Sequence, residues 1–236
     1  MAPLADRSVI VTGASRGIGR AIVSAMAGAG ALVYAAARSR DALDRAAAEA
    51  PGPGRVVPVP TDVTDPGQVA ALVKRVEDEH GHVDILVNNA GVGYYAPVEE
   101  LAVEHWDHMM DANLKGAFLC CRAVLPKMKA RQDGLIINIA SVAGLTTFPG
   151  GAGYCASKWG MVALTETLRE ELRPFEVRAC VVCPGSVQTD FAGTPPKPYA
   201  LRPEDVAATV LHIAQAPRSV IINQVVMRPL VPREYQ

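Results

Sequence analysis

Short apolar runs alternate with longer amphipathic segments along the chain. The segment 66–80, for example, places Val69, Leu72, Val73 and Val76 on one side at helical spacing. The apolar runs have the length of buried strands and are rich in β-branched residues. We expect strands at 8–12, 31–37, 56–59, 84–87, 135–139, 177–183 and 219–223. We expect helices at 20–29, 41–50, 66–80, 153–172 and 204–215, and a mostly helical stretch at 101–130.

Strands that alternate with helices in this way predict an α/β fold, a parallel, doubly wound sheet of about seven strands with helices on both faces. We assign residues 1–236 to a single domain, because we find no repeat, low-complexity tract or linker. Ligands of such sheets bind beyond the carboxyl ends of the strands. The glycines and polar residues that follow the expected strands are therefore the candidates for a functional site.

Charge and composition narrow the possible partners. The 23 Lys and Arg residues are balanced by 24 Asp and Glu residues, which gives no reason to expect nucleic acid or an acidic membrane surface. No apolar run reaches the ~20 residues of a membrane span. The N-terminal residues contain no hydrophobic signal region, so the cytoplasm is the expected compartment.

The five cysteines do not suggest a disulfide framework. Cys180 and Cys183 form a Cys-x-x-Cys sequence, but they lie in an expected strand, where residues three apart point to opposite faces. The histidines do not combine with the cysteines in a zinc-like spacing. We therefore predict no metal ion.

A glycine-rich turn follows the first expected strand. It reads Thr12-Gly13-Ala-Ser-Arg-Gly17-Ile-Gly19 and leads into an alanine-rich helix. Glycines let the backbone approach a ligand, and the helix N-terminus offers free N–H groups with a partial positive charge. The spacing differs from the common Gly-x-Gly-x-x-Gly fingerprint. Its place at the first strand–helix junction nevertheless predicts a phosphate-binding element.

The end of the second expected strand indicates which nicotinamide cofactor fits. Folds that prefer NAD place a carboxylate there, bonded to the ribose 2′-hydroxyl. This chain has Ala37 and then Arg38-Ser39-Arg40 instead. A guanidinium can bind a 2′-phosphate with two hydrogen bonds, and Arg16 in the glycine-rich turn is placed to assist. We therefore predict NADP(H) rather than NAD(H); the alternative is that the arginines only face solvent.

Tyr154 and Lys158 lie four residues apart in an expected helix, so both side chains leave the same face. Ser141 follows the fifth expected strand and can face them across a cleft. A free tyrosine has a pKa of about 10. We expect the ammonium group of Lys158 to lower the pKa of Tyr154 toward neutrality, where general acid–base catalysis is most efficient. The alternative is a core tyrosine and a solvated lysine.

Three further polar positions leave alternatives open. Asp62 can accept a hydrogen bond from an adenine amino group, or it can cap a turn. Asn88 and Asn89 can tie neighbouring backbone segments together, or they can belong to an ordinary turn. Asn113 lies inside an apolar helical stretch and costs helix propensity, so it invites a reason such as holding a water molecule or bending the helix.

Together these motifs resemble the short-chain dehydrogenase/reductase family over nearly the whole chain. Besides the glycine-rich turn, the resemblance includes Asn88-Asn89-Ala90-Gly91 after the fourth strand and Pro184-Gly185 with Thr189 after the sixth. It implies a Rossmann-type fold and an enzyme that interconverts C=O and CH–OH groups. The implied catalytic residues are Asn113, Ser141, Tyr154 and Lys158. The implied cofactor contacts are Gly13, Ser15, Arg16, Gly17, Ile18, Gly19, Arg38, Asp62, Val63, Asn89, Ala90, Gly91, Tyr154, Lys158, Pro184, Gly185, Val187 and Thr189.

The resemblance also implies a role for each catalytic residue. Tyr154 would be the general acid in reduction and the base in oxidation. Lys158 would lower the pKa of Tyr154 and bind the nicotinamide ribose. Ser141 would polarise the substrate oxygen, and Asn113 would anchor a water molecule that relays protons through Lys158.

The expected substrate is a small, neutral and fairly apolar ketone or aldehyde, or the corresponding alcohol. Residues 142–154 carry no charge, and aromatic residues nearby can line a pocket or simply pack the loops. The expected substrate contacts are Ser141, Val142, Phe148, Tyr154, Tyr94 and Phe191, with Tyr199 as a further aromatic candidate. The loop after Thr189 is short, which predicts a small lid and an open pocket.

Other functions stay open at this point. NAD-linked alcohol oxidation requires the inference from Arg38 to be wrong. A 3-oxoacyl-type reductase is less favoured, because the tail 225–236 lacks the glycine-rich ending common in the fatty-acid-synthesis reductases of the family. A regulator that senses NADP(H) without turnover has no need of a tuned tyrosine. The family suggests a homodimer or homotetramer, and the departure in the tail leaves the tetramer in question.

Overall fold

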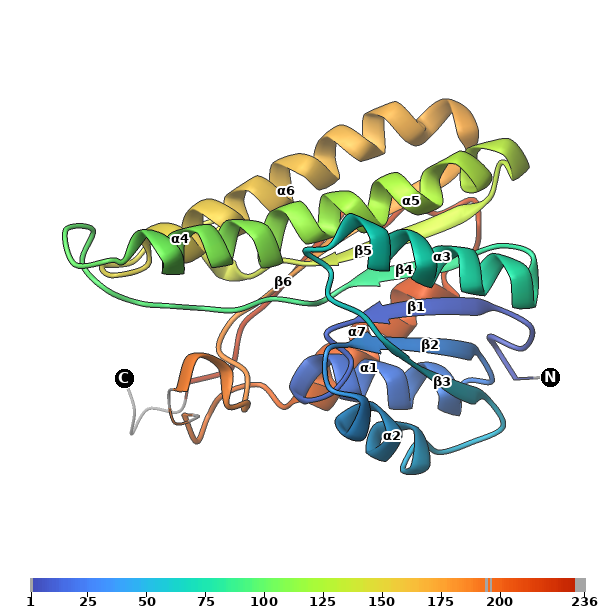
Figure 1. Cartoon of the computed structure of the whole chain (residues 1–236), viewed down its shortest axis with the longest axis horizontal. Coiled ribbons are helices and arrows are strands. Elements are labelled where there is room, and N and C mark those ends of the chain that lie inside the picture. The colour runs from blue at the N-terminus through green and yellow to red at the C-terminus, as the bar shows by residue number, and fades with distance from the viewer. Residues whose placement is uncertain (1, 194, 196, 232–236) are drawn as a thin grey trace.

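The structure is a computed structural model that describes residues 2–193, 195 and 197–231. One parallel sheet of seven strands has the order β3-β2-β1-β4-β5-β6-β7 (Figure 1). The strands are β1 (Ser8–Thr12), β2 (Leu32–Ala37), β3 (Arg55–Pro60), β4 (Ile85–Asn88), β5 (Gly134–Ile139), β6 (Val177–Pro184) and β7 (Gln224–Met227). This sheet confirms the predicted doubly wound architecture. The chain changes direction across the sheet between β1 and β4, which is where such sheets bind ligands.

Helices cover both faces of the sheet, and each layer has its own apolar core. They are α1 (Gly17–Gly28), α2 (Arg40–Ala48), α3 (Pro66–His80), α4 (Val103–Met109), α5 (Gly116–Arg131), α6 (Ala152–Leu172) and α7 (Pro203–Gln215). Helices α1, α2 and α7 pack on one face, and α3, α5 and α6 pack on the other (Figure 1). Within β1, Val9 and Val11 face the first core, whereas Ile10 faces the second. The strand is therefore apolar on both faces between its polar end residues, Ser8 and Thr12.

The two cysteines of the Cys-x-x-Cys sequence lie on opposite faces of β6, as predicted. Cys180 belongs to the core under α1 and α7. Cys183 packs with Met161 and Val162 of α6. Burial raises the pKa of Cys180 to about 12, so this thiol stays protonated at neutral pH.

Two element boundaries differ from the prediction for local reasons. Helix α1 begins at Gly17, three residues before the expected start, so two glycines of the turn already belong to the helix. Strand β3 spans Arg55–Pro60, one residue longer at each end than the expected 56–59, and it contains Pro58. Proline is tolerated in this strand because β3 lies at the edge of the sheet, where one side of the backbone needs no partner.

The predicted last strand, 219–223, is wrong, because β7 spans Gln224–Met227. The side chain of Arg178 donates hydrogen bonds to the carbonyl oxygens of Ala216, Pro217 and Val220. These bonds hold the apolar run as a loop and leave Val220 43% exposed. Pairing with β6 begins only where Gln224 reaches Val181.

The expected helical stretch 101–130 is divided by a π-helix, Met110–Lys115, between α4 and α5. Asn113 lies in this wider turn. Its amide group donates to the carbonyl oxygen of Val92 at 2.9 Å and accepts from the N–H of Val92 at 2.7 Å. It also donates to the hydroxyl of Ser157 at 2.9 Å. The residue that costs helix propensity thus marks a change of helix geometry, which often occurs at functional sites.

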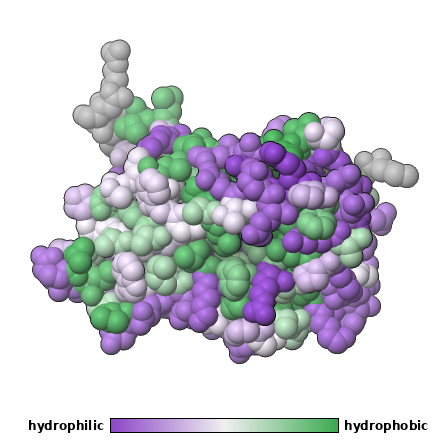
Figure 2. Space-filling model, turned by 90° about the horizontal axis from the view of Figure 1, so that it is seen from above, coloured by the Kyte–Doolittle hydropathy of each residue, from purple (hydrophilic) through white to green (hydrophobic). Residues whose placement is uncertain are grey.

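The outer surface of α4, α5 and α6 mixes apolar and polar side chains, as Figure 2 shows from above this layer. Phe118 on α5 and Trp159 on α6 are exposed. The expected homodimer or homotetramer stays a prediction. No helix within the described residues is long and apolar enough to cross a membrane.

Candidate active site

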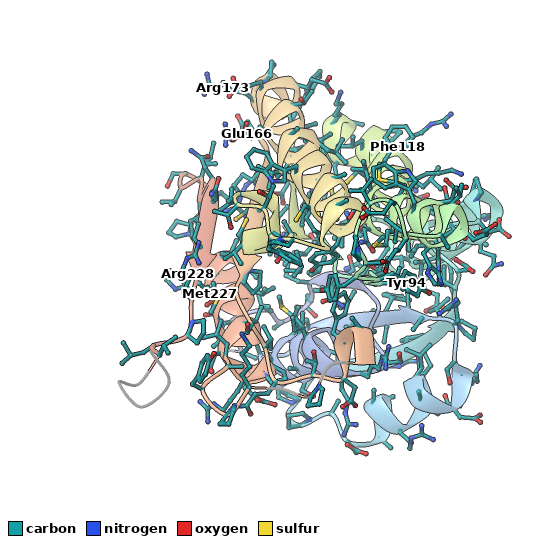
Figure 3. The ribbon with its side chains drawn as sticks, turned by 90° about the vertical axis from the view of Figure 1, so that its left-hand side faces the viewer. Tyr94, Phe118, Glu166, Arg173, Met227 and Arg228 are labelled. Atoms are coloured by element: carbon teal, nitrogen blue, oxygen red, sulfur yellow. The ribbon has the colours of Figure 1, made fainter. Side chains whose placement is uncertain are left out.

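A cleft of about 1810 Å³ lies beyond the carboxyl ends of the strands. This is the side of the molecule that faces the viewer in Figure 3. Small-molecule pockets usually measure about 300–1,000 Å³, so the cleft has room for a dinucleotide and a small substrate together. The predicted site residues that line it are Gly13, Ser15, Arg16, Gly17, Ile18, Gly19, Arg38, Asp62, Val63, Asn89, Ala90, Gly91, Ser141, Val142, Phe148, Tyr154, Lys158, Pro184, Gly185, Val187, Thr189 and Phe191.

The glycine-rich turn has the geometry of a phosphate-binding element. Gly13 and Gly17 have φ angles of +64° and +52°, which favour glycine. A methyl group at Gly19 would collide with the carbonyl oxygen of Gly13. Helix α1 begins without a side-chain cap and without an acidic residue in its first turn, so its N-terminal N–H groups suit an anion. Across the turn, the methyl group of Thr189 lies 3.0 Å from where a Cβ of Gly17 would stand.

Asn88 and Asn89 tie neighbouring strands together, which confirms the first of the two alternatives for them. The amide of Asn89 donates to the carbonyl oxygens of Thr12 and Gly13, at 3.0 and 3.2 Å. The hydroxyl of Thr12 accepts from the N–H of Asn89 at 3.0 Å. The buried amide of Asn88 donates to Asn138 of β5 at 2.9 Å. The phosphate turn is thereby fixed to the end of β4.

Two of the arginines around β2 differ in their surroundings. Arg40 forms an ion pair with Asp44 one turn further along α2, at 2.9 Å, and does not line the cleft. Arg38 is exposed and lines the cleft together with Arg16 of the glycine-rich turn. The region past β2 therefore presents positive charge to the cleft and, as predicted, lacks a carboxylate directly at the strand end.

Asp62 caps a turn and also lines the cleft. Its carboxylate accepts from the N–H of Thr64 at 2.9 Å and from the Thr64 hydroxyl at 2.8 Å. These hydrogen bonds, with the nearby charge of Arg38, hold the pKa of Asp62 below its usual value. The capping alternative is thus shown, whereas contact with adenine stays a prediction.

Lys158 is buried next to Tyr154 on α6. Its side chain is only 4% exposed, and the ammonium group donates to the carbonyl oxygen of Ile139 at 2.9 Å. Burial lowers the pKa of Lys158 to about 8, although the thiol of Cys183 acts in the opposite direction. The ammonium nitrogen lies 5.8 Å from the centre of the Tyr154 ring.

The expectation that Lys158 lowers the pKa of Tyr154 is not met in this structure. Burial raises the pKa of Tyr154 above its usual value, and the neighbouring Tyr95 adds to this, while a hydrogen bond with Ser141 opposes it. The reason is that burial of the phenol dominates, while Lys158 directs its ammonium group to the carbonyl oxygen of Ile139 in β5. Tyr154 is consequently held as a neutral phenol.

Ser141 lines the cleft together with Tyr154 and Lys158. It follows β5, and its hydroxyl accepts from the N–H of Ala143 at 3.1 Å and donates to the carbonyl oxygen of Pro184 at 3.4 Å. The bond to Pro184 connects the end of β5 with the end of β6. Ser141 and Tyr154 thus both present hydroxyl groups to the cleft.

Asn113 lies behind the wall of the cleft and not in it. A Cβ on Gly91 would lie 3.0 Å from the Oδ1 of Asn113 and 3.7 Å from the ammonium nitrogen of Lys158. Glycine at position 91 lets the backbone of the loop after β4 pass close to the Asn113 amide and the Lys158 ammonium group. The structure supports a positioning role for Asn113 through Val92, and its water relay stays a prediction.

The prediction that Tyr94 lines the substrate pocket is wrong. Its ring stacks on His105 of α4 at 4.0 Å, and its hydroxyl lies 3.0 Å from Nδ1 of His108; Figure 3 shows Tyr94 against this helix. Neighbouring residues in an extended segment point in opposite directions, so Tyr95 lines the cleft instead, and His108 lines it too. The sequence carries no periodic signal that tells which of the two adjacent tyrosines faces the cleft, because the loop after β4 is irregular. Tyr199 also lies outside the cleft lining.

A second group of titratable residues lies at the opposite end of the sheet. His80, His82 and Asp84 place potential metal ligands within 4.8 Å of one another. However, the carboxylate of Asp84 already accepts hydrogen bonds from Arg7 at 2.8 Å and from the N–H of Ser8 at 2.8 Å. Burial alone would raise the pKa of Asp84, but these bonds outweigh it and hold the pKa below its usual value. We interpret the group as an ion-pair network.

Comparison with known proteins agrees with this geometry. A family model for the short-chain dehydrogenases matches residues 7–198. A 3-oxoacyl-(acyl-carrier-protein) reductase from Thermotoga maritima is 35% identical, covering 94% of this chain and 96% of the relative. A metagenomic short-chain oxidoreductase solved in complex with NADP is 37% identical, with a TM-score of 0.87, covering 98% of this chain and 100% of that one. An alcohol dehydrogenase from the archaeon Thermococcus sibiricus, complexed with 5-hydroxy-NADP, is 34% identical, with a TM-score of 0.90, covering 96% and 98%. The chain therefore belongs to the short-chain dehydrogenase/reductase family and is an oxidoreductase.

Proposed function

We propose that this oxidoreductase uses NADP(H) to reduce a small, neutral ketone or aldehyde to an alcohol. The observation that carries the proposal is the pair of arginines, Arg16 and Arg38, on the cleft beside the end of β2, without a carboxylate at the strand end. A guanidinium binds a phosphate with two hydrogen bonds, whereas a carboxylate would repel it. The NADP and 5-hydroxy-NADP in the two solved relatives support the same cofactor.

The catalytic residues suit proton donation to a carbonyl oxygen. When bound, the nicotinamide would supply the hydride to the carbonyl carbon. The neutral phenol of Tyr154 would donate its proton to the oxygen as the C=O bond becomes a C–O bond. The Ser141 hydroxyl donates its single proton to Pro184 in this structure. With substrate bound, it would turn that proton to the substrate oxygen. Because its pKa is raised, Tyr154 carries the proton that reduction requires at neutral pH.

The cofactor assignment is tested by replacing Arg38 with Asp. We expect Kd for NADPH to rise about 10- to 100-fold, because charged hydrogen bonds are worth about 1.5–3 kcal/mol each. Kd for NADH should not rise. The matched control is Arg40→Ala, because Arg40 is paired with Asp44 away from the cleft. Intrinsic fluorescence titrations would measure all values, and wild-type preference for NADH would refute the proposal.

The catalytic assignment is tested by Tyr154→Phe. Loss of the proton donor should lower kcat about 10²- to 10⁴-fold, the usual contribution of general acid catalysis. Binding of NADPH should stay within about twofold, because the ring is retained. Steady-state rates with a panel of ketones and aldehydes would be compared with cofactor titrations. A variant that keeps its turnover would exclude Tyr154 as the acid.

A 3-oxoacyl-type reductase is the second candidate, and the 35% identity with the Thermotoga maritima reductase favours it. Such a substrate is delivered on a carrier protein, whereas a free ketone enters the cleft alone. Comparing kcat/KM for a 3-oxoacyl thioester on acyl carrier protein with that for simple ketones separates the two. We expect the free ketones to be turned over without any carrier.

A further inference from the structure

We propose that the substrate carries a flat aromatic ring beside its carbonyl group. This inference rests on the proposed function, in which the hydroxyl of Tyr154 is the reacting group. The rings of Tyr95 and Phe191 contact the ring of Tyr154, and the ring of Phe148 packs against Tyr95. Each of the three comes from a different loop of the cleft. Tyr95 follows β4, Phe148 follows β5 and Phe191 follows β6.

These rings meet at steep angles. The centre of the Tyr95 ring lies 5.8 Å from that of Tyr154 at 90°, and 5.6 Å from that of Phe148 at 71°. Phe191 lies 5.6 Å from Tyr154 at 56°. Aromatic pairs favour such tilted contacts at about 4.5–7 Å. A ring on the substrate can extend the same arrangement, because the carbonyl that it carries must reach the hydroxyl of Tyr154.

Two glycines set the positions of two of these rings. A Cβ on Gly93 would lie 2.6 Å from Cε1 of Phe191, and a Cβ on Gly151 would lie 2.7 Å from the ring of Phe148. Side chains at either position would push the rings away. The absence of side chains at Gly93 and Gly151 thus leaves the space that the rings of Phe191 and Phe148 occupy.

Much of this aromatic surface is open to solvent. Tyr95 is 44% exposed and Phe148 is 42% exposed, and both line the cleft beside Tyr154. Exposed apolar surface of this kind marks ligand-binding grooves. Faces held at fixed, steep angles discriminate by shape, so they favour a planar ring over a puckered ring of the same size.

The test compares acetophenone with cyclohexyl methyl ketone. Both carry a six-membered ring beside the carbonyl, but only the ring of acetophenone is planar, aromatic and conjugated with the C=O bond. Conjugation makes acetophenone the less reactive ketone, so a preference for it must come from the protein. We expect kcat/KM to be about three- to tenfold higher for acetophenone, the range given by one or two aromatic contacts. Equal or lower kcat/KM would overturn the inference.

Variants locate the preference on the aromatic rings of the cleft. Tyr95→Leu and Phe191→Leu should each remove most of the preference, whereas the matched control Tyr95→Phe, which keeps the ring, should retain it. A preference that persists in both leucine variants would refute the role of these rings.

Binding separates failure of this inference from failure of the proposed function. Kd of both ketones is measured by calorimetry with the Tyr154→Phe variant saturated with NADPH, where no turnover is needed. Tighter binding of acetophenone supports the aromatic substrate even if the wild type reduces neither ketone, an outcome that would reject only the proposed reaction. Equal binding overturns the inference even if both ketones are reduced.

Discussion

The ammonium group of Lys158 makes cofactor binding sensitive to pH. Burial lowers its pKa from 10.5 to about 8, so Lys158 is a cation below pH 8 and becomes neutral above it. A neutral amine attracts the cofactor less than an ammonium group does. We therefore expect Kd for NADPH to increase as pH rises from 7 to 9, and binding near pH 8 to take up protons. Calorimetry in buffers of different ionisation enthalpy would measure both effects.

The control for this prediction is Lys158→Arg, since a guanidinium keeps its charge throughout this pH range. Its Kd should be flat between pH 7 and 9. A wild-type Kd that is equally flat would show that the charge of Lys158 makes no contribution to binding.

The sequence predicts a cleft residue correctly where a helix or a strand end determines the direction of its side chain. Tyr154 and Lys158 share a face of α6 because they are four residues apart, and Ser141 was placed by the end of β5. Tyr94 was misassigned because the loop after β4 has no regular period to orient its side chains. The raised pKa of Tyr154 was also missed, because it depends on burial in the folded protein and on the neighbouring Tyr95, which is distant in sequence.

Among the elements, the π-helix Met110–Lys115 carries Asn113, whose side chain holds the backbone of Val92 in the wall of the cleft. Replacing Asn113 with Ala would leave the N–H and carbonyl groups of Val92 without their partners. We expect the free energy of unfolding to fall by about 1–3 kcal/mol. We also expect kcat/KM to fall, because Val92 lines the cleft. Denaturant unfolding and steady-state kinetics would measure the two effects.

Asp111→Asn is the matched control in the same π-helix. Asp111 forms an exposed pair with Lys115 at 3.1 Å, and such pairs contribute about 0–1 kcal/mol. This variant should change neither quantity appreciably. If Asn113→Ala lost stability but kept its kcat/KM, Asn113 would not position the wall of the cleft.

The elements themselves were predictable where the pattern is local. The first six strands were found near their true positions because each is an apolar run between helices. The seventh was misplaced because the run at 219–223 is as apolar as a strand, while the bonds that hold it as a loop come from Arg178 on β6. A contact over that separation leaves no periodic signal in the segment itself.

At the scale of the whole molecule, chemistry and stabilisation lie at opposite ends of the sheet. The cleft occupies the carboxyl ends of the strands, whereas Asp84, Arg7 and Arg131 form an ion-pair network at the other end. The alternation of strands and helices predicted parallel strands. Because the strands are parallel, motifs that are distant in sequence meet at the carboxyl ends of the strands. The network was not predicted, because its members are charged residues near strand and helix ends with no distinctive spacing.

This separation predicts that Asp84→Asn destabilises the fold without changing the reaction. The side chain of Asp84 is 3% exposed, so the change removes a buried charge from its partners and should cost about 1–3 kcal/mol at pH 7. Because the folded-state pKa of Asp84 is lowered, its contribution is complete above the unfolded pKa of about 3.9 and disappears as pH falls through the folded value. The difference in unfolding free energy between wild type and variant should therefore shrink as pH falls below 4.

The exposed pair of Lys74 and Asp78 supplies the control, because Asp78→Asn removes a carboxylate of the same kind from the surface. Its cost should be within about 1 kcal/mol at every pH. With Asp84→Asn, kcat should match that of the wild type below the unfolding temperature, since no part of the network lines the cleft. A large loss of kcat at unchanged folded fraction would show that the two ends of the sheet are coupled, and the division between a stabilising end and a reacting end would then be wrong.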